Sequence, residues 1–137
     1  MTKIKQIPEV DQDTRKKLKE ITCFALDMDG TIYLGEKWIE GARDFLRAVE
    51  ECGKQYIFLT NNSSKNPQAY VRKLSKMGLT VGEDRIVTSG QASIAYLKKH
   101  YPGKRVYLLG NELLTEEFLA EGICLDERAP EVVMVGF

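Results

Sequence analysis

Two aspartates, Asp27 and Asp29, stand one residue apart at the end of a mostly apolar run, and a Gly-Thr pair follows them. The run, residues 21–26, is typical of a strand buried on both faces of a sheet. Open parallel α/β sheets bind their ligands outside the carboxyl ends of their strands, which is where these carboxylates fall. Burying two carboxylates side by side is costly unless a cation or a reaction requires them. We therefore interpret residues 27–31 as the candidate site.

A second buried strand is predicted over residues 55–59, and the polar residues 60–64 follow it. A helical stripe of apolar residues lies between the two strands. The strand–helix–strand order predicts parallel pairing with a right-handed crossover. The carboxyl ends of both strands then lie side by side, so the acids face the side chains of Thr60, Asn61 and Asn62.

The remaining elements alternate in the order expected of an α/β fold. A short hairpin or flap is predicted over residues 32–40, around Gly35 and Glu36. Asn66 and Pro67 are placed to cap and begin a helix. The later elements are a strand or loop at 86–90 with Ser89 as the cap of a helix ending near 101, a strand at 105–110, a helix around 113–119 and an apolar strand at 132–137.

Composition limits the classes of function that fit this chain of 137 residues, a length typical of one domain. Twenty basic and twenty acidic residues cancel, which argues against nucleic acid or an anionic membrane as a partner. Residues 1–20 form a charged lead-in, with a short helix that Asp11 or Asp13 can cap.

The three cysteines, Cys23, Cys52 and Cys124, are widely separated and stand in apolar contexts, so we expect reduced thiols buried in the core. The amino terminus lacks an apolar segment of signal-peptide length, and no run approaches a membrane span. These features predict a cytoplasmic protein.

The motif Asp-x-Asp-Gly-Thr after a buried strand resembles the first motif of the haloacid dehalogenase superfamily of phosphohydrolases. Followed one crossover later by Thr60-Asn61-Asn62, with a short flap between, it is similar to the NagD / p-nitrophenylphosphatase-like, or type IIA, branch. The resemblance covers Ile21 to Phe137. It implies that residues 21–137 form the amino-terminal part of a three-layer, Rossmann-like parallel-sheet core.

The resemblance also implies roles for individual residues. Asp27 would be the nucleophile that forms an aspartyl-phosphate, and Asp29 the general acid and base. Mg²⁺ is the implied cofactor, bound by the Asp27 side chain and the Asp29 backbone carbonyl. Thr60 and Asn61, with Asn62 nearby, would bind the phosphoryl oxygens. The implied substrate is a small phosphate monoester, such as a sugar phosphate or a nucleotide.

Several parts of the family's pattern do not occur in these 137 residues. They are the lysine that neutralises phosphate charge, the later Gly-Asp motif that completes the metal shell, and the cap domain that selects the substrate. Lys65 is a less favoured substitute for the missing lysine. We therefore interpret the chain as the amino-terminal half of such a phosphatase, with impaired activity. An open apolar edge on strand 21–27 would allow self-association.

Two alternative functions remain. One is a non-catalytic module that binds phosphate or a partner through the same strand ends. The other is a phospho-accepting receiver domain, which is disfavoured because the second strand ends in Thr60-Asn61 and offers no aspartate.

Overall fold

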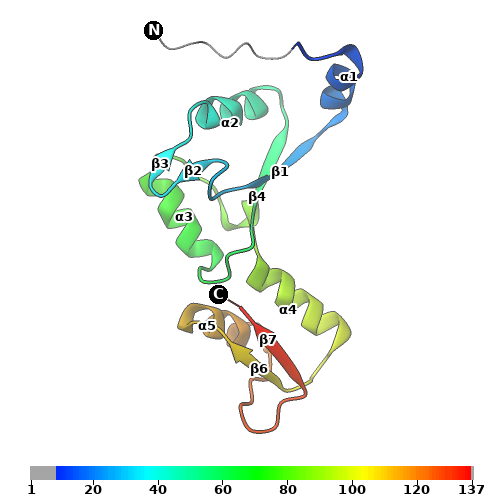
Figure 1. Cartoon of the computed structure of the whole chain (residues 1–137), viewed down its shortest axis with the longest axis vertical. Coiled ribbons are helices and arrows are strands. Elements are labelled where there is room, and N and C mark those ends of the chain that lie inside the picture. The colour runs from blue at the N-terminus through cyan, green and yellow to red at the C-terminus, as the bar shows by residue number, and fades with distance from the viewer. Residues whose placement is uncertain (1–8, 137) are drawn as a thin grey trace.

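The computed structural model describes residues 9–136, which contain two parallel sheets, each with its own apolar core. The first sheet has the order β1 (Cys23–Asp27), β4 (Gln55–Thr60) and β5 (Ile86–Thr88). The second pairs β6 (Val106–Leu109) with β7 (Val132–Val135). Figure 1 shows two lobes, with α4 (Ser89–His100) leading from one to the other. The α/β parallel class is confirmed, but the strands expected in one sheet form two.

The first sheet is covered on one face by α2 (Ala42–Glu51) and α3 (Pro67–Lys76). The connections from β1 to β4 and from β4 to β5 run in the same direction along the sheet. Because such crossovers are right-handed, α2 and α3 lie on the same face. The core between them includes Phe58 and Leu74, both with no exposed surface. The side chains that alternate with this core are exposed on the other face: Cys23, Ala25, Asp27, Leu59 and Val87. The prediction that β1 is buried on both faces is therefore wrong.

The prediction of buried thiols is also wrong, although all three cysteines are free. Cys23 lies on the uncovered face of β1, Cys52 is the C-cap of α2, and Cys124 follows α5 (Glu112–Ala120). All three are exposed, because the first lies on an uncovered sheet face and the others lie beyond helix ends.

The predicted flap is a hairpin of β2 (Tyr33–Leu34) and β3 (Lys37–Trp38). Gly35 lies in its turn with φ +63°, a left-handed conformation that glycine adopts without steric cost. The Trp38 indole N–H donates to the Met77 carbonyl at 2.9 Å, just beyond the end of α3. The flap is thus packed onto α3.

Helix caps agree with the sequence at α3 and differ by one residue at α4. The Asn66 side chain accepts from the Ala69 N–H at 3.0 Å, as predicted. At α4 the cap is Thr88, whose hydroxyl accepts from the Gln91 N–H, while the Gln91 side chain accepts from the Thr88 N–H. Ser89 is the first helical residue, because this reciprocal pair requires a glutamine three residues after the cap.

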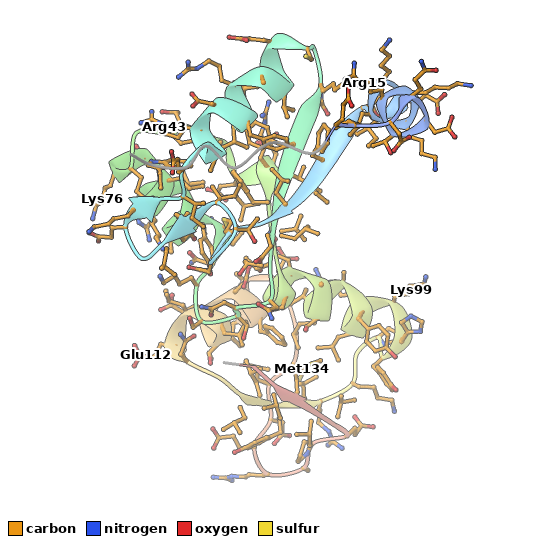
Figure 2. All side chains as sticks on the ribbon, turned by 45° about the horizontal axis from the view of Figure 1, so that its top comes forward. Arg15, Arg43, Lys76, Lys99, Glu112 and Met134 are labelled. Atoms are coloured by element: carbon orange, nitrogen blue, oxygen red, sulfur yellow. The ribbon has the colours of Figure 1, made fainter. Side chains whose placement is uncertain are left out.

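The lead-in contains α1 (Gln12–Glu20), capped by the Asp11 carboxylate through the Thr14 N–H at 2.8 Å. No residue of α1 is buried, and Figure 2 shows Arg15 projecting from it. Residues 1–8 of the predicted lead-in lie outside the described residues. A short 3₁₀ turn, η1 (Glu83–Arg85), precedes β5. No helix within residues 9–136 is long and apolar enough to cross a membrane.

Candidate active site

The carboxyl ends of β1 and β4 lie side by side, with Asp27 opposite Leu59 in the parallel register. An open depression on the uncovered face of the first sheet contains Asp27, Thr60 and Asn61 together. Its other lining residues are Ala25, Leu59, Val87, Thr88, Ser89 and Ala92. Asp29 and Asn62 do not line this depression, so the sequence-predicted residues divide into two groups.

Local geometry places both aspartates outside the core. Met28, between them, is completely buried, and alternation along the chain turns its two neighbours away from it. Gly30 has φ +83° and its N–H donates to the Tyr33 carbonyl at 2.8 Å, which closes the turn into the flap. The Thr31 hydroxyl donates to Asp27 Oδ2 at 3.3 Å. Asp27 and Asp29 are exposed, so the cost of burying two acids does not apply here.

Asp29 lies against α3, where Lys73 provides a cation that the sequence reasoning missed. Lys73 Nζ is 3.7 Å from Asp29 Oδ1 and 3.8 Å from the centre of the Tyr33 ring. The available signal was helical spacing: Lys73 follows Tyr70 by three residues and therefore shares its face of α3. Lys65, the cation considered from the sequence, instead lies 5.8 Å from the ring of Tyr70.

The side chains of Thr60 and Asn62 shape their own loop. Thr60 is buried, and its hydroxyl accepts from the Asn62 N–H at 3.2 Å and lies 3.4 Å from the Tyr70 hydroxyl. The Asn62 side-chain oxygen accepts from the N–H and the hydroxyl of Ser64, at 2.8 and 2.6 Å. Asn61 is exposed in the depression beside Asp27.

Two side chains, one at the start of α4 and one just before α5, hold this loop in place, and neither was predicted from the sequence as a site residue. The Ser89 hydroxyl donates to the Asn61 carbonyl at 2.9 Å. The Asn111 amide donates to the Ser64 carbonyl at 2.8 Å. The conformation of residues 60–64 therefore depends on contacts from both α4 and the start of α5.

The negative charges of the two aspartates contribute to the raised pKa values of two buried tyrosines, Tyr33 and Tyr70. Burial, followed by the negative charge of Asp29, raises the pKa of Tyr33 well above its usual value. Burial also raises the pKa of Tyr70; its hydrogen bond with Thr60 opposes this shift, and the charges of Asp29 and Asp27 add to it. Both phenols therefore remain protonated at neutral pH. The Tyr33 hydroxyl has no hydrogen-bond partner within residues 9–136.

The two aspartates fit part of a magnesium shell. Carboxylate and carbonyl oxygens are the ligands that Mg²⁺ prefers, and Mg²⁺ is usually bound through one or two carboxylates, substrate phosphates and several waters. The Asp27 side chain, which would be the carboxylate ligand, is accessible to solvent, as such a site requires. The described part of the chain has no cluster of three or more His, Cys, Asp or Glu side chains suited to a metal, so a site here would have few protein ligands.

Comparisons with known proteins point to one family of hydrolases. Residues 24–124 match the haloacid dehalogenase-like hydrolases. An acid sugar phosphatase of Staphylococcus saprophyticus is 33% identical over 120 residues, covering 87% of this chain and 46% of that protein. The structure of 4-nitrophenylphosphatase from Thermotoga maritima is 42% identical, covers 88% of this chain and 46% of that one, and superposes with a TM-score of 0.82.

The structure of a glycerol phosphate phosphatase from Mycobacterium tuberculosis, in complex with magnesium, is 29% identical with a TM-score of 0.75. It is matched over 87% of this chain and 37% of its own. The chain spans less than half the length of each of these three relatives. The match to the family covers most of this chain and includes both strand ends of the candidate site, so the chain belongs to the haloacid dehalogenase-like hydrolases, within the branch that its motifs predicted.

Proposed function

We propose that this chain carries the nucleophile and the phosphate-binding loop of a phosphatase that acts on small phosphate monoesters. The observation that supports this most strongly is the depression shared by Asp27, Thr60 and Asn61 at two adjacent strand ends. The relatives support the substrate class, because their names specify sugar, glycerol and 4-nitrophenyl phosphatases.

In the proposed reaction, an oxygen of Asp27 attacks phosphorus and the bond to the leaving alcohol breaks, which produces an aspartyl-phosphate. Asp29 donates a proton to the departing oxygen. It then accepts a proton from the water that attacks the aspartyl-phosphate and releases inorganic phosphate. Asn61 donates hydrogen bonds to the phosphoryl oxygens, together with backbone N–H groups of the loop that Thr60 and Asn62 shape.

Mg²⁺ is the proposed cofactor, with Asp27 and Asp29 as its ligands in this chain. When bound, it would offset the repulsion between these carboxylates and the phosphate dianion. The magnesium complex of the M. tuberculosis relative supports this choice. We further propose a cytoplasmic location, which the three free, separated cysteines support.

The alternative is a module that binds phosphate or a partner without turnover. The small number of acidic ligands at the site favours it. β1 is an edge strand of the first sheet, so self-association through this edge is part of the same alternative.

Hydrolysis of 4-nitrophenyl phosphate by the 137-residue chain separates the two functions. The phosphatase predicts turnover that requires Mg²⁺, is lost on chelation and is lost in Asp27→Asn. Phosphate binding measured by calorimetry, without turnover at any Mg²⁺ concentration, would support the binding module. Size-exclusion chromatography of the same sample reports self-association.

A further inference from the structure

Asp29 is half exposed, and a carboxylate in that position samples several orientations unless another group restrains it. The restraint in this structure is Lys73, whose Nζ lies 3.7 Å from Asp29 Oδ1. The Lys73 side chain is 20% exposed, against 54% for Asp29, so the cation is the better-ordered partner of the pair.

Lys73 is itself held by the flap. Its ammonium lies 3.8 Å from the centre of the Tyr33 ring, within the range of a cation–π contact. Tyr33 is completely buried and its backbone carbonyl accepts from Gly30 in the turn that follows Asp29. One ammonium therefore bridges a buried ring and an exposed carboxylate that belong to the same turn.

The contact to Asp29 is long for a hydrogen bond, which makes it an electrostatic restraint on the carboxylate. It holds the Asp29 carboxylate beside the flap and α3, just beyond the end of β1, while Asp27 at the strand end lines the depression. The two acids of the motif are thus oriented by different partners, Thr31 for Asp27 and Lys73 for Asp29.

We propose that Lys73 is a positioning residue that sets the orientation of the Asp29 carboxylate, with the Tyr33 ring as its support. This inference deepens the proposed function and rests on it for the role of Asp29 in turnover. Lys73 acts through Asp29 and does not contact the substrate. Its loss should therefore lower kcat and leave KM unchanged.

The contact between Lys73 and Asp29, which the inference requires, is tested first by NMR, which needs no activity. The Hε signals of Lys73 are identified as those lost in Lys73→Met, and the Tyr33 ring current should shift them to low frequency. Asp29→Asn should move these signals, because the ammonium loses its charged partner. Asp44→Asn, on the exposed side of α2, is the matched control and should leave them in place. Unchanged Lys73 signals in Asp29→Asn would overturn the inference.

Kinetics then test the consequence. Lys73→Met should lower kcat about 10-fold with KM unchanged, because a misplaced general acid or base reduces the rate of proton transfer. Lys73→Arg should restore most of kcat, since it keeps a cation over the ring. Lys76→Met, one turn along α3 and labelled in Figure 2, should behave as the wild type. Thermal melts confirm that each variant is folded.

Wild-type kcat in a folded Lys73→Met variant would overturn the inference. A rise in KM alone would do so too, because it would indicate a contact with substrate. A wild-type chain without turnover would contradict the proposed function, and the NMR comparison would still decide whether Lys73 restrains the Asp29 carboxylate through direct contact.

Discussion

The two lobes differ in the size of their cores and in what they contribute to the site. Within residues 9–136, the first core has twelve buried hydrophobic residues and the second has five. The acids, the loop of residues 60–64 and Lys73 all belong to the first lobe. The second lobe leaves Leu109, Val133 and Val135 more than half exposed, and it contacts the loop through Asn111. The residues of the proposed site thus lie on the larger core, and the smaller core supports one of its loops.

The largest expected effect is a loss of turnover, and only substitutions in the first lobe should cause it. Asp29→Asn removes the proposed general acid, a loss of about 10²–10⁴-fold for an alkyl phosphate whose leaving oxygen needs a proton. The loss should be smaller for 4-nitrophenyl phosphate, because nitrophenolate leaves without protonation. Parallel kcat/KM measurements on the two substrates check this. Glu112→Gln in the second lobe, labelled in Figure 2, is the control. An equal loss of kcat/KM in this variant would contradict the assignment of the proposed site to the first lobe.

The second prediction compares the two cores directly. Phe58→Ala and Phe118→Ala each remove a completely buried ring, at a cost of about 3–5 kcal/mol. Phe58→Ala should destabilise the first lobe and with it the whole chain. Phe118→Ala should open α4, α5 and the β6–β7 pair while β1 and β4 stay protected.

Peptide-resolved hydrogen exchange measures both variants. The wild-type chain provides the reference protection for each strand. If Phe118→Ala lost protection equally in β1 and β7, the two lobes would unfold as one unit. This result would contradict the prediction that the second lobe can open while the first stays folded.

A smaller effect is expected where the lobes meet. Asn111→Ala removes the cap of α5, where the side chain accepts from the Leu114 N–H at 3.0 Å, and also the bond to the Ser64 carbonyl. We expect a loss of roughly 1 kcal/mol in stability and an increase in KM, because the loop is less restrained. Asn66→Ala is the control for capping alone, since it caps α3 in the same way. Stability is read from urea unfolding, and the idea fails if Asn66→Ala raises KM as much.

The smallest effect concerns the pH dependence of the second lobe. Burial, and then the charge of Glu121, raises the pKa of Glu117 above its usual value. The folded chain therefore holds this proton more tightly than the unfolded chain does. The resulting stability is fully present below the ordinary carboxyl range and is lost as pH rises through that range toward the raised value.

Glu117→Gln should accordingly raise the melting temperature at pH 7 more than at pH 4. Differential scanning calorimetry at the two pH values measures the difference. Glu116→Gln, at the exposed neighbouring position, should show no such dependence. A larger gain at pH 4 than at pH 7 would reverse the sign and refute the prediction.

Local signals in the sequence predicted local structure well. The Asn66-Pro67 cap and the hairpin turn at Gly35 depend on backbone preferences of a few neighbouring residues, and both are present. The family was also predictable, because the Asp27–Thr31 motif and the Thr60 loop combine fixed residue types with a fixed topology.

Features that depend on distant packing were not predictable. The apolar run of β1 indicates a strand, but it does not reveal that α2 and α3 both pack on one side. Likewise, Lys73 was not predicted as a site residue, since only the folded flap places the Tyr33 ring beneath its ammonium. The separation of the strands into two sheets also depends on distant packing. Among the described strands, β6 pairs only with β7, and no local signal in the sequence indicates this.

The central claim is that Asp27 becomes phosphorylated during turnover. The most direct measurement is acid quenching of the chain with substrate and Mg²⁺, followed by peptide mapping of the phosphoryl group by mass spectrometry. The account predicts an added phosphoryl group on the peptide that contains Asp27, and none in Asp27→Asn. Turnover in the wild type with the phosphoryl group on another residue, or turnover retained by Asp27→Asn, would contradict it.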